Sequence, residues 1–128
     1  MRNNREYVIC KDLALYMKLQ YPKVLYRFDL AGLNLSIAQA GMNKAIQRGK
    51  GWPDMFIAEA RDGYNGLFIE VKAEGIKLYK KNFEAVSEHI TEQFNCMDEL
   101  RCKGYKADFG IGFDSCKLQI DQYLKFNK

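Results

Sequence analysis

The sequence contains few of the features that mark membrane, secreted or zinc-binding proteins. It has no apolar run long enough to span a bilayer, and its first residues, Met-Arg-Asn-Asn-Arg-Glu, lack the apolar core of a signal peptide. The four cysteines form no Cys-x-x-Cys pair, and the one histidine, His89, stands at no zinc spacing. We therefore expect a cytoplasmic protein with no membrane partner, whose thiols are reduced and mostly contribute to packing.

Length and charge narrow the class only a little. The 128 residues are enough for one domain with its own core, so we expect a single domain over residues 1–128. The net charge of +4 leaves nucleic-acid binding as one option among several. The positions of the charges along the chain must therefore decide between the options.

The stretch from 51 to 72 predicts a β-hairpin. Residues 55–58 and 67–71 are two largely apolar runs, and each has the length of a short strand. Residues 61–66 between them contain Asp-Gly and Asn-Gly, the pairs that favour tight hairpin turns. The two runs should therefore form antiparallel strands.

Charged side chains gather on one face of this predicted hairpin. Because side chains alternate along a strand, Phe68, Glu70 and Lys72 should share a face. If the hairpin closes symmetrically about residues 62–64, Asp54 lies opposite Lys72 and diagonal to Glu70. Two acids and one base then converge.

Such a trio suits metal-assisted hydrolysis of a phosphodiester. Asp54 and Glu70 would supply hard oxygen ligands for Mg²⁺ or Mn²⁺, and the Lys72 ammonium would orient the attacking water. The alternative is a pair of surface charges worth less than about 1 kcal/mol. If the two carboxylates repel each other without metal, alanine at either position should leave the metal-free fold as stable as the wild type or slightly more stable.

The rest of the chain predicts helices and two more strands around the hairpin. Helices are expected at 4–19, from a cap at Asn34 or Ser36 to about 48, at 85–103, and after a cap at Asp114 or Ser115; strands are expected at 24–28 and 106–113. A strand, a crossover helix and a strand favour parallel pairing. We therefore expect an α/β fold in which helices flank a mixed central β-sheet.

Two short motifs carry a resemblance to a known family. Gly-Trp-Pro-Asp at 51–54, followed by Ile-Glu-Val-Lys at 69–72, resembles the PD-(D/E)XK nuclease signature, and its context is similar to the small stand-alone VRR-NUC domains of phages and prophages. The resemblance implies a restriction-endonuclease-like core. It also implies an endonuclease that hydrolyses DNA with Mg²⁺ or Mn²⁺ and uses no small-molecule cofactor.

The resemblance assigns roles within the site. It implies that Asp54 and Glu70 bind the metal, with the Val71 carbonyl and Glu6 as further ligands, and that Lys72 activates water. Glu6 has a second interpretation, because an acid in the first turn of a helix also interacts favourably with the helix dipole. Where the family often has a glutamine one turn later, this chain has Cys10, which removes a polar side chain from that position.

Gln93 is predicted to lie on the apolar stripe of its helix. A buried amide without partners costs about 1–3 kcal/mol, so its side chain should have a specific hydrogen-bond partner. One candidate partner is a strand carbonyl. The resemblance implies the other, in which Gln93 belongs to the catalytic site and orients Lys72, a phosphate or a water. His89 lies at the edge of the same stripe and receives no role.

Six cations are candidates for contacts with DNA phosphates. They are Lys44, Arg48, Lys50, Lys77, Lys80 and Lys81. A solvated helix face and a mobile basic loop would show the same pattern. The resemblance further implies a homodimer and a branched substrate such as a four-way junction, whereas a non-catalytic nucleic-acid-binding module on the same fold is the alternative.

Overall fold

Four strands form one mixed sheet in the order β1–β2–β3–β4. The structure is a computed structural model that describes residues 4–29 and 33–125. The strands are β1 (Tyr26–Phe28), β2 (Met55–Ile57), β3 (Leu67–Lys72) and β4 (Lys106–Ile111). The β1–β2 and β2–β3 pairs are antiparallel, and the β3–β4 pair is parallel. The predicted mixed sheet and the predicted parallel pairing of the last strand are therefore confirmed.

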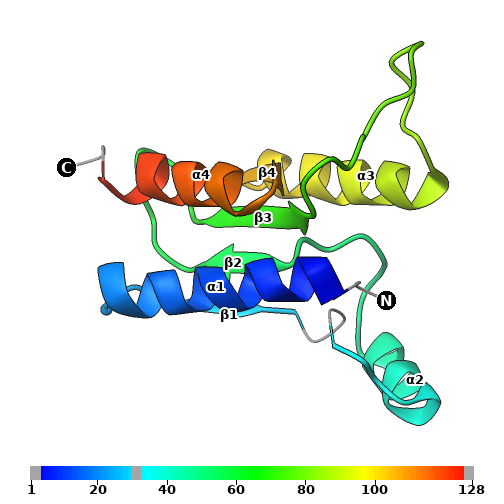
Figure 1. Cartoon of the computed structure of the whole chain (residues 1–128), viewed down its shortest axis with the longest axis horizontal. Coiled ribbons are helices and arrows are strands. Elements are labelled where there is room, and N and C mark those ends of the chain that lie inside the picture. Colours follow the sequence, from blue (N-terminus) through cyan, green and yellow to red (C-terminus); the bar gives the residue numbers. More distant parts are fainter. Residues whose placement is uncertain (1–3, 30–32, 126–128) are drawn as a thin grey trace.

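Helices cover both faces of this sheet. The helices are α1 (Asn4–Gln20), α2 (Ile37–Ala45), α3 (Glu88–Cys102) and α4 (Phe113–Lys125). Figure 1 shows α1 and α4 in front of the sheet, and their side chains share one core with alternate residues of β3. On the opposite face α3 packs against Phe68, Ala107 and Phe109. The predicted α/β fold with flanking helices is therefore confirmed.

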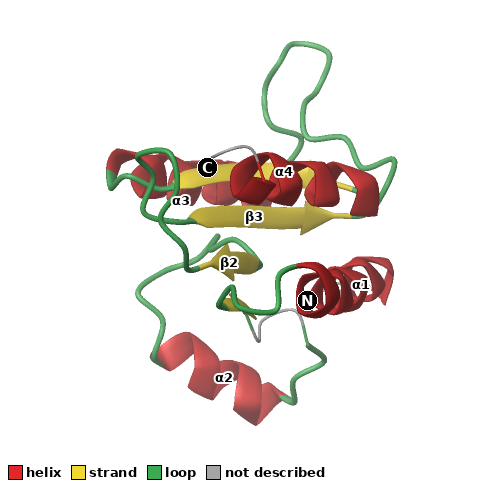
Figure 2. Ribbon diagram, turned by 90° about the vertical axis from the view of Figure 1, so that its left-hand side faces the viewer, coloured by secondary structure: helices red, strands yellow, loops and turns green. Residues whose placement is uncertain are grey.

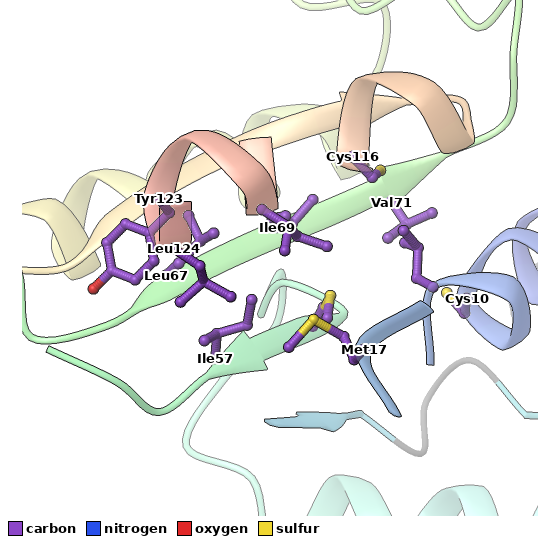
Figure 3. Packing of buried hydrophobic residues seen from close by; sticks show 12 residues of the cluster. Cys10, Met17, Ile57, Leu67, Ile69, Val71, Cys116, Tyr123 and Leu124 are labelled. Carbon is purple, nitrogen blue, oxygen red and sulfur yellow. The ribbon is translucent and has the colours of Figure 1, made fainter. Parts of the chain in front are cut away.

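The main core lies between β3 and the α1–α4 layer (Figure 3). Leu67, Ile69 and Val71 point into it from the central strand, and all three are fully buried. Cys10 from α1 and Cys116 from α4 pack there as well, and burial raises the pKa of the Cys116 thiol to about 12. These two cysteines confirm the predicted packing role, whereas Cys102 is an exposed free thiol. None of the described helices is long and apolar enough to cross a membrane.

A polar cluster joins α1 to α4. The hydroxyls of Tyr16 and Tyr21 donate to the Asp121 carboxylate at 2.6 and 2.7 Å, and the Lys117 ammonium lies 3.1 Å from it. Partial burial of Asp121 would raise its pKa, but these hydrogen bonds and the Lys117 charge outweigh it and lower the pKa below its ordinary value. The cluster fixes the position of α1, whose first turn carries Glu6.

The hairpin closes in a register different from the predicted one. Met55 pairs with Ile69 and Ile57 with Leu67. Extending this register by one residue brings Asp54 opposite Glu70, where symmetric closure predicted Lys72. The tight turn covers residues 61–64. Three residues, 58–60, separate β2 from this turn, but only two, 65–66, separate the turn from β3, so the strands are not centred on the turn. The error is two residues, which preserves the face of every side chain.

Element boundaries differ from the predicted ones mainly at their ends. The first strand is shorter than 24–28, α2 stops at 45 instead of continuing to about 48, and α3 begins after a cap at Ser87. The capping box between Ser36 and Gln39 places the start of α2 at one of the two predicted caps. The last helix begins at Phe113, before the predicted caps, because the chain reverses at Gly112.

Two segments project from the body on opposite sides (Figures 1 and 2). One is α2, none of whose residues is buried, so the apolar stripe that includes Met42 and Ile46 does not pack on the sheet. The other is the long connection between β3 and α3. Within it Tyr79 bridges to Ala85, which makes a small hairpin over residues 78–86. Both segments leave the end of the molecule at which β3 finishes.

Candidate active site

Four polar side chains are buried within the described part of the chain, and they are the four predicted as catalytic. Asp54 is 7% exposed, Glu70 4%, Lys72 6% and Gln93 4%. Burying a charge is costly unless it is paired, so sequences rarely bury one without a specific arrangement. The interpretation of Glu70 and Lys72 as solvated surface charges is therefore wrong.

The backbone before β2 holds Asp54 in place. Gly51 has φ +85°, which lets the chain pass close to the Glu92 carbonyl before Pro53 leads into the strand. The carboxylate Oδ2 of Asp54 accepts a hydrogen bond from the Val71 backbone N–H at 2.8 Å. Its backbone carbonyl accepts one from the Asp29 N–H at 2.8 Å. Asp54 is thereby tied to β3 on one side and to the residue that follows β1 on the other.

Glu70 contacts two of the other buried polar side chains. Its Oε2 lies 3.6 Å from the Lys72 Nζ and accepts a hydrogen bond from the Gln93 Nε2 at 3.0 Å. Gln93 therefore contacts the carboxylate and does not use its amide on a strand carbonyl. The same Nε2 lies 3.2 Å from the His89 Nε2, and the His89 side chain is largely exposed. Sequence reasoning gave His89 no role, although its spacing of four residues before Gln93 puts both on one helix face.

These side chains line one open cavity of about 380 Å³. Asp54, Glu70, Lys72 and Gln93 form part of its wall, and Glu6 contributes from the first turn of α1. The buried Oε1 of Gln93 accepts no hydrogen bond from the described residues. A water in the cavity would satisfy this oxygen, since an unsatisfied buried acceptor costs about 1–3 kcal/mol.

The donor set suits a small hard cation. Mg²⁺ is commonly bound through one or two carboxylates and keeps several waters, and Asp54 and Glu70 provide two carboxylates in the wall of the cavity. Within residues 4–29 and 33–125, no three His, Cys, Asp or Glu side chains are grouped closely enough to hold a metal. Glu6 shares the cavity without completing such a group. The Val71 carbonyl stays a predicted ligand, while the backbone N–H of Val71 donates a hydrogen bond to Asp54.

The six predicted DNA-binding cations fall into three groups. Lys44 and Lys50 line the cavity together with the carboxylates. Arg48 is ion-paired with Glu99 at 2.8 Å, which raises its pKa. The remaining lysines, at positions 77, 80 and 81, belong to the projecting β3–α3 connection. The structure thus brings two of the six cations to the cavity itself.

Asp29 is a residue of the site that the sequence did not reveal. It follows β1, lines the same cavity as Asp54 and donates its backbone N–H to the Asp54 carbonyl. No spacing rule connects a residue near position 29 with one near 54, because their proximity depends on the antiparallel β1–β2 pairing. An acid directly after a short strand was the one signal available.

Comparison with known proteins supports the fold. The sequence matches no family model and no curated protein. Among solved structures, the chain is similar to one described as a "VRR_NUC domain protein", with 22% identity, a TM-score of 0.67 and coverage of 100% of this chain and 94% of the other. At this level of identity the likeness concerns the three-dimensional arrangement of the chain. The protein therefore has the fold of a VRR-NUC domain protein, as the two sequence motifs implied.

Proposed function

We propose that the protein is a metal-dependent endonuclease that hydrolyses DNA phosphodiester bonds with Mg²⁺ or Mn²⁺. The observation that carries the proposal is the burial of Asp54, Glu70, Lys72 and Gln93 around one open cavity. A fold has no stabilising reason to bury two carboxylates, an ammonium and an amide together, because replacing such groups by apolar ones is often neutral or stabilising. The likeness to a VRR-NUC domain protein agrees with this proposal.

Each side chain has a task that its position supports. The Asp54 and Glu70 carboxylates hold the cation, which when bound polarises the phosphate and offsets its developing charge. Lys72, close to Glu70, orients a water or neutralises charge on the phosphate. Gln93 holds Glu70 in one orientation through its hydrogen bond. Glu6 and the Val71 carbonyl are the candidate additional ligands.

The proposed DNA partner rests on the cations around the cavity. Lys44 and Lys50 lie in its wall beside the carboxylates, where they can contact the phosphates on either side of the bond that is cut. The lysines at 77, 80 and 81 extend the positive charge along the projecting connection. Contacts between lysines and phosphates do not depend on the base sequence of the DNA, so these lysines support binding to the DNA backbone.

We further propose that the protein acts as a homodimer on branched DNA such as four-way junctions. Exposed apolar side chains support an association of this kind, because a second chain could cover them. They are Ile37 and Met42 of α2 and Ile46 at its C-terminal cap. Light scattering of the wild type and of Met42→Glu tests the dimer. A wild-type mass of one chain would contradict it.

Cleavage assays separate this function from a non-catalytic DNA-binding module. Purified protein is incubated with linear, flap and four-way substrates, with Mn²⁺ or with EDTA. The proposal predicts Mn²⁺-dependent cleavage that Glu70→Gln abolishes, with the four-way substrate cut fastest. Binding without cleavage of any substrate would favour the binding module.

A further inference from the structure

A second cavity, of about 410 Å³, adjoins the proposed active site. It lies over the sheet face that carries Glu70 and Lys72, because Arg27 pairs with Phe56 and Phe56 with Phe68 across three neighbouring strands. The three paired side chains therefore extend the sheet face of the active site toward the edge strand β1. Trp52, Asp54 and Asp29 line both cavities and join them.

Aromatic rings form much of this second cavity. Phe56 and Phe68 are stacked with their centroids 4.4 Å apart, and Tyr105 meets Phe68 edge-on at 5.3 Å. Trp52 approaches Phe68 at 6.1 Å from the side of the active site. The exposed Arg27 completes the wall at the outer strand. Planar rings and a guanidinium beside an open space are the groups on which nucleobases stack.

We propose that this cavity binds one unstacked nucleobase, from a nucleotide next to the phosphodiester that is cut at Asp54 and Glu70. The proposal rests on the proposed function. Trp52, shared by the two cavities, would stack on the base, and Arg27 would contact the base or the following phosphate. A base within a continuous duplex cannot reach such a wall without leaving its stack. The preferred substrate therefore has a cleavage site at which a nucleotide can leave its stack, as it can next to a branch point.

Trp52 is the single tryptophan of the chain, so the tryptophan fluorescence of the protein comes from this one side chain, where the two cavities join. The experiment titrates the wild type in EDTA with a ten-nucleotide thymidine strand and with an abasic strand of equal length and charge. Binding is followed in parallel by anisotropy of a fluorescein on each strand. EDTA prevents metal-dependent cleavage, so the result does not depend on the proposed catalysis.

The thymidine strand should quench Trp52 and the abasic strand should not. In anisotropy, the loss of bases should weaken binding by roughly 5- to 150-fold, the range for one base stacked on an aromatic side chain. Trp52→Leu should weaken binding of the thymidine strand within the same range and leave binding of the abasic strand unchanged. Equal quenching by both strands, or equal affinity for them, would overturn the proposal.

A matched variant controls for the loss of any exposed aromatic ring. Tyr64 is 38% exposed, as is Trp52, but lies in the turn at the far end of the β2–β3 hairpin. Tyr64→Leu should bind both strands as the wild type does. An equal loss in Tyr64→Leu and Trp52→Leu would contradict a specific site at Trp52. Quenching without any nuclease activity would leave the base site standing and overturn the proposed function alone.

Discussion

The Asp54 carboxylate accepts a hydrogen bond from the Val71 backbone N–H at 2.8 Å, across the β2–β3 hairpin. Removing this acceptor leaves a buried donor unsatisfied, so Asp54→Ala should lower the metal-free free energy of unfolding by about 1–3 kcal/mol. Carboxylate repulsion alone predicts equal or slightly higher stability for Asp54→Ala. The hydrogen bond reverses the expected sign, and urea unfolding in EDTA measures it.

Asp54→Asn is the matched variant for that measurement. Its amide oxygen can still accept from Val71 while its charge is gone, so its stability should lie above that of Asp54→Ala. If Asp54→Ala unfolds at the same urea concentration as the wild type, the hydrogen bond contributes nothing to the metal-free fold.

Gly51 is expected to be intolerant of any side chain. Its φ is +85°, and a Cβ there would lie 2.5 Å from the Glu92 carbonyl oxygen. Gly51→Ala should therefore cost more than about 2 kcal/mol of stability and displace Asp54, three residues later. Gly49→Ala is the control, because nothing lies within 4 Å of its added Cβ. Thermal melting of both variants checks the prediction, and equal melting temperatures would refute it.

Gln93 should matter for turnover more than for stability. Gln93→Met keeps most of the side-chain volume but removes the donor to Glu70, and loss of such an orienting hydrogen bond typically costs about 10- to 100-fold in activity or metal affinity. The melting temperature should fall little. His89→Ala is the comparison, since His89 is largely exposed and should lose less activity. A Gln93→Met enzyme as active as the wild type would assign Gln93 to the core alone.

DNA affinity should fall steeply with salt, and the cations should not contribute equally. Each phosphate contact adds roughly −0.9 to the slope of log affinity against log salt concentration for duplex DNA. Lys50→Met should reduce the slope by about one such contact, because Lys50 lines the cavity. Arg48→Met should change it less, since Arg48 is already paired with Glu99. Fluorescence anisotropy over a salt series measures both slopes, and a flat dependence for the wild type would disprove backbone binding.

The sequence predicts which face of a strand a side chain occupies better than it predicts which residue lies opposite on the neighbouring strand. The side shared by Phe68, Glu70 and Lys72 follows from the alternation of a strand, which any even shift of register preserves. The partner of Asp54 depends on how many residues the turn region contributes to each strand, which the Asp-Gly signal alone does not determine. That is why these side chains share a face as predicted, whereas the predicted register of the hairpin was wrong by two residues.

Other features depend on tertiary contacts that no local pattern encodes. The apolar stripe of α2 has the period of a buried face, yet no residue of this helix is buried in the part of the chain that the structure describes. Arg27, Phe56 and Tyr105 come from distant segments and meet only through strand pairing and the α3–β4 turn. The aromatic cavity could therefore not be predicted from the sequence, because no local pattern connects the residues that line it.

Calorimetric titration with Mn²⁺ tests most directly whether Asp54 and Glu70 bind a divalent cation while Lys72 acts in the chemical step. Asp54→Asn and Glu70→Gln should weaken Mn²⁺ binding strongly and abolish cleavage, because each removes an anionic ligand. Lys72→Met should bind Mn²⁺ as tightly as the wild type or more tightly, because it removes a competing positive charge, and should still lose cleavage. Mn²⁺ binding lost in Lys72→Met as fully as in the carboxylate variants, or unchanged in all three, would contradict the account.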